Sequence, residues 1–408
     1  MSTKKGNMRR MILSGGVAAL ITLGMLGAAR ADITSDQAAA ILIFPKLVVD
    51  TSAKLGPATD SEIQITNTSN SVIAARCFLI NTTSYCSNSP VDNPIACTAE
   101  GVANHLPPPN GGCDPFAACV QQWTENDFRL TLTKRQPVSW KVSEGLADVP
   151  LSASSSVPGA QTDPFIGELR CVEVDPTTFN PSSGFNPVNN GAGDLKGEAS
   201  IVSVDSDSGR VDARKYNGIG IQAEGVNNGD DVLNIGGPSA EYSGCPNVII
   251  VDHLFDDANV STGDSTTGTV RTDLTFTPCG ADLNLQIPNT VTLQFLVFNE
   301  FEQRFSTSTR ITCSKEIQLS DIDTRPTSSD NFASIFNVNV QGTFAGQTRV
   351  RPVADTANGV GDTILAVSEE FWDCSSGPKG RCSAAANVHF QGTRDLGDTM
   401  IIPGDNPP

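Results

Sequence analysis

Short runs of alternating apolar and polar residues, separated by Gly, Pro, Asn and Ser, recur along nearly the whole of this 408-residue chain. The segments 127–132, 136–142 and 336–341 alternate with a period of two, and 248–251 is continuously apolar, as in a strand covered on both faces. After the first 31 residues, no window longer than ten residues carries the apolar stripe of an amphipathic helix. The pattern therefore predicts an all-β chain.

Two segments of the chain share one order of elements, although few of their residues are identical. Residues 62–81 and 292–319 each contain a strand, a polar turn and a second strand that carries a cysteine. Because 408 residues are also too many for one small core, we expect two domains. The expected organisation is a signal peptide at 1–31, an N-terminal β-sandwich region at 32–278 with a Cys-rich loop insertion, a C-terminal β-sandwich domain at 279–402, and a disordered tail at 403–408.

Two of the alternating segments carry a resemblance to a known class of domain. Residues 60–76 read DSEIQITNTSNSVIAAR, and residues 128–140 read FRLTLTKRQPVSW. This stretch resembles an Ig-like sandwich of bacterial secreted and surface proteins, and the whole chain is similar to uncharacterised secreted bacterial proteins. The resemblance covers about residues 40–150 and implies an Ig-like sandwich there. Together with the repeated order of elements and the cysteine-flanked loops, it leads us to expect two antiparallel Ig-like β-sandwich domains with long disulfide-stapled loops. It implies a scaffold and no particular reaction.

The first 31 residues have the three parts of a secretory signal peptide. Lysines and arginines at positions 4, 5, 9 and 10 precede the apolar run 11–28, and an Ala-Arg-Ala sequence at 29–31 ends the segment. Glycines dilute the apolar run, which favours a cleaved signal over a membrane anchor. The adjacent arginines at 9 and 10 leave a twin-arginine signal as an alternative.

No transmembrane segment is expected after cleavage. The next most apolar stretch is 38–49, and Pro45 and Lys46 interrupt it after seven apolar residues. We expect this stretch to be a buried strand. The mature protein is therefore expected to be exported, with a periplasmic, cell-surface or extracellular location.

Eleven cysteines remain after cleavage, and in an exported chain most of them should be paired. A zinc site would need CxxC or Cys–His spacing, and neither occurs here. Six cysteines of the N-terminal region form an even set, which we expect to pair among themselves in a connectivity that the sequence leaves open. They are Cys77, Cys86, Cys97, Cys113, Cys119 and Cys171.

The later region holds five cysteines, an odd number. Cys374 and Cys382 flank a short turn-rich segment, so we expect these two to pair. One of the remaining three, Cys245, Cys279 or Cys313, is expected to stay free.

One acidic segment offers a weak calcium candidate. Asp205, Asp207 and Asp212 alternate partly as in a calcium loop, but Gly209 and Arg210 stand where further ligands should be. A hairpin turn between two strands is the favoured interpretation of this segment. No other cofactor is expected.

The formal charge of −18 argues against nucleic acid or an anionic membrane as a partner, because both would repel the chain. With three histidines and no catalytic motif, the chain is not expected to be an enzyme. Glu300 and Glu302 are better explained as a solvated hairpin tip than as a carboxylate pair for glycoside hydrolysis.

For sugar binding, Tyr85 and Tyr242 are the candidates for exposed stacking groups, since they neighbour turn residues.

These observations favour an exported noncatalytic β-sandwich protein with a structural or surface-interaction role, such as adhesion or envelope assembly. Its expected partner is a protein or glycan at the cell surface. The alternative is a carbohydrate- or calcium-binding module, and the third hypothesis is an unrecognised hydrolase.

Overall fold

The computed structural model describes residues 33–34, 36–88, 96–97, 118–151, 155–181, 185–186, 191–205, 209–225, 228–261, 267–287, 289–323, 325–326, 332–353, 363–374, 380–393 and 397–404. The expected signal peptide at 1–31 lies outside these residues. The contacts gather Asp32–Pro408 into a single compact unit. Within the described part of the chain, no helix is both long and apolar enough to cross a membrane.

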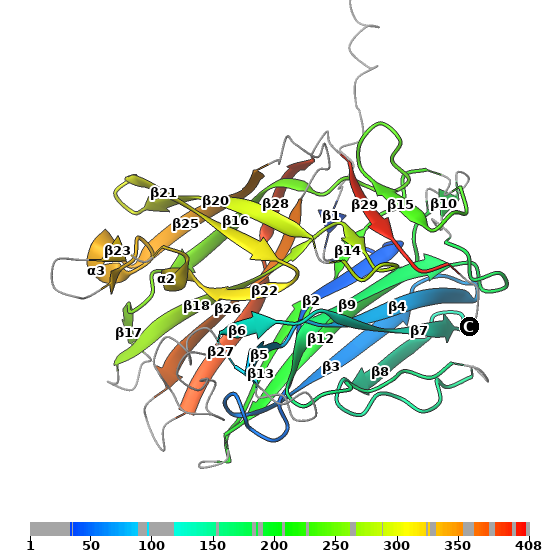
Figure 1. Ribbon diagram of the computed structural model, residues 1–408, viewed down its shortest axis with the longest axis horizontal. Coiled ribbons are helices and arrows are strands. Elements are labelled where there is room, and N and C mark those ends of the chain that lie inside the picture. The colour runs from blue at the N-terminus through cyan, green and yellow to red at the C-terminus, as the bar shows by residue number, and fades with distance from the viewer. Residues whose placement is uncertain are drawn as a thin grey trace, which may run out of the picture. The chain divides into compact units, whose positions relative to one another are not determined.

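Most strands belong to five sheets (Figure 1). Sheet 1 has the order β1 (Ile33–Thr34), β14 (Ile219–Ile221), β2 (Ile41–Val49), β9 (Phe165–Val174), β4 (Ile73–Asn81), β7 (Thr124–Leu132). Sheet 2 has the order β13 (Val211–Asn217), β12 (Leu195–Val204), β3 (Ala58–Asn67), β8 (Pro137–Lys141). Sheet 3 has the order β15 (Val232–Ile235), β29 (Asp398–Ile401), β19 (Ala281–Asp282).

The later part of the chain supplies the other two sheets. Sheet 4 has the order β21 (Arg304–Thr312), β20 (Thr290–Asn299), β25 (Ala345–Val353), β16 (Pro246–Leu254), β28 (His389–Thr393). Sheet 5 has the order β17 (Asn259–Ser261), β18 (Thr267–Pro278), β26 (Ile364–Cys374), β27 (Gly380–Asn387), with β22 (Lys315–Gln318) also on β18. Short elements complete the description: β5 (Ser84–Cys86) with β6 (Cys119–Gln121), β10 (Phe185–Asn186) with β11 (Gly191–Ala192), β23 (Arg325–Pro326) with β24 (Phe332–Ala333), α2 (Leu319–Ile322) and α3 (Val338–Gln341).

The all-β prediction is confirmed, but the expected pair of Ig-like sandwiches is wrong. The sheets are arranged as a five-bladed β-propeller. The sequence of a propeller usually contains a repeat of about 40–50 residues for each blade. Here strands that lie far apart in the sequence share a sheet, as β2, β9, β4 and β7 do, so no such repeat is present to be read.

One disulfide of the N-terminal set joins two strands of the same sheet. Cys77 of β4 and Cys171 of β9 are directly opposite each other on neighbouring strands, with Cα atoms 4.1 Å apart. An Ig-type disulfide joins the two facing sheets. Strands β4 and β9 are buried along nearly their whole length, so they carry no period-two pattern.

Two clusters of buried apolar side chains lie in the unit. The first draws on 40–283 and on a few residues of 365–402, and the second draws on 249–388. Sheet 3 joins strands from both sides of the expected boundary between 278 and 279, and β18 of the second cluster ends at Pro278. The contacts therefore do not divide the chain at that position.

Strand β2 is buried along nearly its whole length, as expected for 38–49, and it contains the irregularity that positions the site. Its register with β9 shifts between Phe44 and Leu47, so Pro45 and Lys46 form a bulge. The hydroxyl group of Tyr216 on β13 accepts a hydrogen bond from the Lys46 backbone N–H at 3.1 Å and donates one to the Lys46 carbonyl oxygen. The bulge thereby keeps its backbone groups paired while it re-aims the Lys46 side chain.

Two local predictions need correction. The alternation at 336–341 predicts a strand, but residues 338–341 form the short helix α3, capped by the Asn337 side chain and by Gly342 at φ 68°. A segment of six residues is too short for its apolar period to decide between the two. At the other end of the chain, Pro403 is held by a hydrogen bond of 2.5 Å from Arg76 to its carbonyl oxygen, whereas 405–408 lie outside the described residues.

The disulfides described are Cys77–Cys171, Cys97–Cys119 and Cys245–Cys279. Cys86 and Cys382 are disulfide-bonded as well. Cys113 and the side chain of Cys374 lie outside the described residues, so the Cys374–Cys382 pair and the completion of the N-terminal set stay predictions. Several disulfides indicate an oxidising, extracytoplasmic compartment.

Cys313 is a free and buried thiol, and burial raises its pKa to about 12. Because the thiolate is the reactive form, Cys313 should be inert in the folded protein. We expect maleimide to label unreduced protein at one cysteine, and only after denaturation. Mass spectrometry would locate the label at Cys313, and Cys313→Ala should abolish it. Labelling of several cysteines would contradict the paired framework.

Candidate functional site

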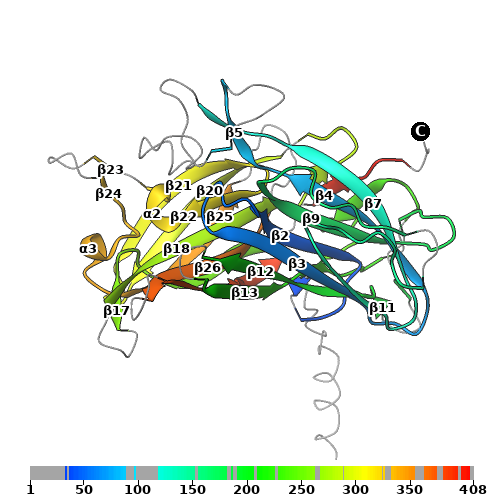
Figure 2. The ribbon, with the colours of Figure 1, turned by 90° about the horizontal axis from the view of Figure 1, so that it is seen from below.

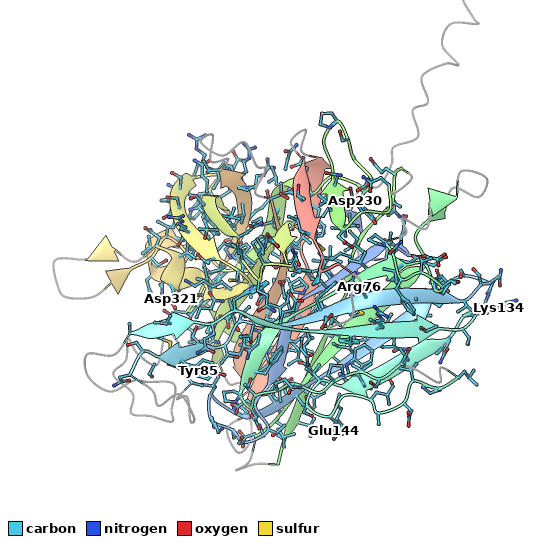
Figure 3. All side chains as sticks on the ribbon, turned by 45° about the vertical axis from the view of Figure 1, so that its right-hand side comes forward. Arg76, Tyr85, Lys134, Glu144, Asp230 and Asp321 are labelled. Atoms are coloured by element: carbon cyan, nitrogen blue, oxygen red, sulfur yellow. A yellow bond between two sulfur atoms is a disulfide. The ribbon has the colours of Figure 1, made fainter. Side chains whose placement is uncertain are left out.

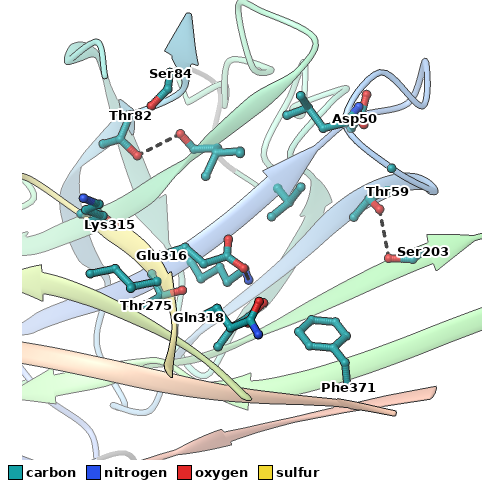
Figure 4. A pocket seen from close by; sticks show the side chains of 18 of the residues that line it. Asp50, Thr59, Thr82, Ser84, Ser203, Thr275, Lys315, Glu316, Gln318 and Phe371 are labelled. Atoms are coloured by element: carbon teal, nitrogen blue, oxygen red, sulfur yellow. Dashed lines mark hydrogen bonds and ion pairs between the residues drawn. The ribbon is translucent and has the colours of Figure 1, made fainter. Parts of the chain in front are cut away.

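A cavity of about 720 Å³ lies where sheets 1, 2 and 5 meet (Figure 4). The bulge of β2 lines it on one side and the ends of β12 and β13 on another. Strands β18 and β22 supply charged residues to the remaining wall, and β26 supplies Phe371. Strand β13 also packs against β27, which brings sheets 2 and 5 side by side (Figure 2). We call this cavity the cleft.

Lys46 is the centre of a buried ionic network in the wall of the cleft. Its ammonium group donates to Glu316 at 2.6 Å and to Glu369, and its side chain is only 3% exposed. Glu369 is 1% exposed and also accepts from Arg214 of β13. The network thus joins β2, β13, β22 and β26, which come from four distant parts of the chain.

A second carboxylate–guanidinium pair extends the network. Arg271 holds Asp273 through two hydrogen bonds, Nε to Oδ1 at 3.0 Å and Nη2 to Oδ2 at 2.5 Å. The guanidinium groups of Arg214 and Arg271 both lie over the ring of Phe371, 5.2 and 5.0 Å from its centroid. Phe371 is itself only 7% exposed, so its ring offers little surface for stacking a sugar.

The network brings three carboxyl groups close to three cations. The pKa values of two of these carboxyl groups, Asp273 and Glu316, shift in opposite directions. Burial raises the pKa of Asp273, and the nearby carboxylate of Glu316 raises it further. Burial also opposes ionisation of Glu316, but the ammonium group of Lys46 outweighs it and leaves the pKa of Glu316 lowered. For Lys46 itself, Glu316 and Glu369 outweigh burial and raise the pKa. Lys46 and Glu316 are accordingly held as an ion pair.

Beside the cleft, a second buried ionic group joins sheet 1 to sheet 5. Arg170 of β9 donates to Glu168 at 3.0 Å, to the Thr277 hydroxyl at 2.9 Å, and to the carbonyl oxygens of Pro278 at 2.7 Å and Cys279 at 3.0 Å. Glu168 also accepts from the Thr277 hydroxyl. All five donors of a guanidinium group are hard to satisfy in a core, and these contacts occupy most of them.

The rest of the cleft has a mixed lining, which includes apolar side chains such as Leu55 and Ile317 and the cations Arg210 and Lys315. Hydroxyl, amide and carboxylate groups lie among them. They belong to Asp50, Thr59, Thr82, Ser84, Gln121, Ser203, Asp205, Asp212, Thr275, Thr309, Ser314, Gln318 and Asp321. Several hold one another in place: the hydroxyls of Thr59 and Ser203 are 3.0 Å apart, and the Gln121 amide donates to the Ser314 carbonyl oxygen at 2.5 Å. The Cys97–Cys119 disulfide also borders the cleft.

The segment that contains Asp205 and Asp212 connects two strands of a hairpin, as expected. Strands β12 and β13 pair as an antiparallel hairpin, and the backbone of Asp205 is hydrogen-bonded to Arg210 and Gly209 across the turn. Asp205 and Asp212 both line the cleft, and Asp212 accepts from the Ser383 hydroxyl. Asp207 lies outside the described residues, so calcium binding here stays a prediction.

Tyr85, Tyr242, Glu300 and Glu302 do not line the cleft. Tyr85 and Tyr242 are buried, so they are not the exposed stacking groups that their turn neighbours predict. Among the acid–base groups outside the cleft, His253 faces the core beside Phe255, whereas Asp252 is exposed, and burial lowers the pKa of His253 to about 4. Glu300 and Glu302 are exposed at the tip of the β20–β21 hairpin, as expected.

Sequence reasoning missed the ionic network. Its one visible signal was Lys46, a lysine inside an otherwise apolar run, beside a proline that disrupts the strand. A lysine buried in such a place requires a carboxylate partner. Glu369 and Glu316 lie more than 260 residues away in the sequence, so nothing in the local pattern identified them.

No protein-family model and no curated protein matches this chain. The candidate site therefore rests on its own geometry.

The network generates a prediction about stability. Glu369→Gln removes the charge that Lys46 and Arg214 share, and leaves both cations underpaired in the interior. Breaking a buried ion pair in this way costs about 3–5 kcal/mol in the free energy of unfolding. Urea denaturation should show this loss.

The matched control is Glu144→Gln, which breaks the exposed Lys141–Glu144 pair on the surface (Figure 3). Its side chains are 57% and 68% exposed, so the loss should stay within about 0.5 kcal/mol. Equal losses in the two variants would show that the buried network does not hold the wall of the cleft.

Proposed function

We propose that this chain is an exported, noncatalytic surface-interaction protein, and that the cleft is its contact site for a glycan. The observation that carries the proposal is the lining of the cleft, in which hydroxyl and amide groups lie beside the paired charges of the network around Lys46. A ligand rich in hydroxyl groups can exchange hydrogen bonds with such a surface. A strongly charged ligand would have to compete with the existing ion pairs.

The rigidity of the wall supports binding. Lys46, Glu369 and Arg214 are buried and mutually bonded, so the groups around them do not have to be ordered when a ligand arrives. Preorganisation of this kind lowers the entropic cost of binding.

The described lining also favours binding over chemistry. It contains no histidine, and its two cysteines are joined in the Cys97–Cys119 disulfide. Asp273 and Glu316 have divergent proton affinities, but Arg271 and Lys46 hold them within the network. We assign them a structural role, and the noncatalytic part of the proposal depends on that assignment.

Because Phe371 is only 7% exposed, binding should rely on hydrogen bonds without aromatic stacking. We expect weak affinity, with Kd of about 0.1–1 mM, which corresponds to about −4 to −5.5 kcal/mol. Multivalent display at a cell surface would raise the apparent affinity.

Gly56 provides a sharp test. It lines the cleft, and a β-carbon built there meets no atom within 4 Å. Gly56→Trp should therefore fold normally and fill part of the cavity, whereas Gly56→Ala should leave it open. We expect the exported protein to bind glycans on an array of immobilised neutral and N-acetylated oligosaccharides. In calorimetric titration of those glycans, Gly56→Trp should weaken binding at least tenfold and Gly56→Ala by less than twofold.

The outcome has three informative failures. If no glycan binds saturably, or if Gly56→Trp binds as well as the unmodified chain, the cleft is not a glycan site. If new reducing ends appear in the bound glycan, the noncatalytic part is wrong. Repeating the titration with EGTA tests whether calcium at Asp205 and Asp212 contributes.

A further inference from the structure

The outer face of sheet 4 gathers arginines, although the chain as a whole carries a charge of −18. Residues directly opposite each other in an antiparallel sheet share a face. Leu296 of β20 lies opposite Ser306 of β21 and Arg349 of β25. The residues of β20 two positions before and after Leu296 lie on the same face. Gln294 is opposite Arg351, and Phe298 is opposite Arg304. Strands β21 and β25 flank β20 (Figure 1). Three arginines of these two strands therefore share one face of the sheet.

The opposite face of β20 explains why this arrangement is stable. Val291, Leu293, Phe295 and Val297 are fully buried in the second core cluster, so the alternating residues must face outward. Arg304 and Arg351 are exposed, and Arg349 is half-buried. Changes to the two exposed side chains should not disturb the core.

The three guanidinium groups border one pocket. Its volume is about 240 Å³, and its lining consists of Gln294, Leu296, Arg304, Ser306, Arg349 and Arg351. The lining includes no carboxylate. Among the described residues, none of the three arginines is in an ion pair.

Neighbouring side chains orient Arg349 in the pocket. Arg349 lies over the ring of Phe298, 5.9 Å from its centroid, and its Nε donates to Gln347 at 3.3 Å. Gln347 in turn donates to Asp252 at 3.0 Å, so the amide side chain stands between that carboxylate and the arginine. Arg349 is thereby oriented while its remaining N–H groups stay available for a ligand.

We propose that this pocket binds a tetrahedral oxyanion, namely the phosphate or sulfate ester group of a small ligand or saccharide. Guanidinium groups present paired N–H donors that match the oxygens of such groups, and the Ser306 hydroxyl and Gln294 amide add neutral donors. The charge of the whole chain disfavours extended polyanions, which feel it over a distance of many ångströms. A single ester group entering the pocket is governed by the three nearby cations instead. The site is separate from the cleft and does not depend on the function proposed for it.

The test is calorimetric titration of the exported protein with sodium sulfate and with sodium phosphate, against sodium chloride at equal ionic strength. We expect one saturable site for sulfate, phosphate or both, and none for chloride. Whichever anion binds more tightly identifies the ester class. No saturable site for either anion would overturn the proposal.

Variants show whether the binding belongs to this pocket. Arg304→Gln and Arg351→Gln should each raise Kd at least fivefold, and Arg351→Lys should raise it less, because it keeps the charge but loses the paired donors. Ser306→Asp, which places a carboxylate in the lining, should abolish binding. Lys134→Gln removes the same charge from the turn between β7 and β8, and it should leave Kd unchanged (Figure 3). Equal losses in Lys134→Gln and Arg351→Gln would mean that only the overall charge matters, and the pocket would be rejected as the site.

Discussion

The burial of Lys46 between Glu369 and Glu316 is the interaction on which the rest of this structure depends. An ammonium group in the interior is tolerated only when opposite charges and hydrogen bonds replace its water. The bulge at Pro45 and Lys46 turns the side chain toward those partners, and Tyr216 keeps the bulged backbone hydrogen-bonded. A local irregularity of β2 thus places Lys46 at the junction of sheets 1, 2 and 5.

The same contacts connect the two core clusters. Lys46 and Arg214 come from strands of the first cluster, whereas Glu316 and Asp273 come from strands that cover the second. Arg170 makes a second connection by donating to Thr277, Pro278 and Cys279. Each connection is unfavourable to break, because one partner would be left charged and buried. The cleft forms in the angle between the sheets so connected, which is why its wall is both polar and rigid.

Much of the strand content could be predicted, because alternation reports directly which residues of a strand face a core. The segments around Phe128 and Trp140 are strands, and 41–49 is buried as expected. Alternation does not report which strands become neighbours. Strands β2 and β9, for example, pair although more than a hundred residues separate them. The expected sandwiches are wrong because the alternation does not show which strands share a sheet. The six residues at 336–341 were too short for the pattern to distinguish a strand from α3.

The candidate sites were harder to predict than the fold class. Asp205 and Asp212 were noticed, but the structure makes them part of a larger cleft that long-range contacts create. Arg304, Arg349 and Arg351 are unremarkable in the sequence and come together only through the register of β20 with its two neighbours. In both sites the sequence shows the charge of each residue, but the strand topology determines which residues lie beside it.

Differential scanning calorimetry of the exported protein tests most directly whether the buried ions unite the two clusters. If they do, the chain unfolds in one transition whose calorimetric enthalpy equals the van't Hoff enthalpy. Two resolved transitions, one for each cluster, would contradict the account.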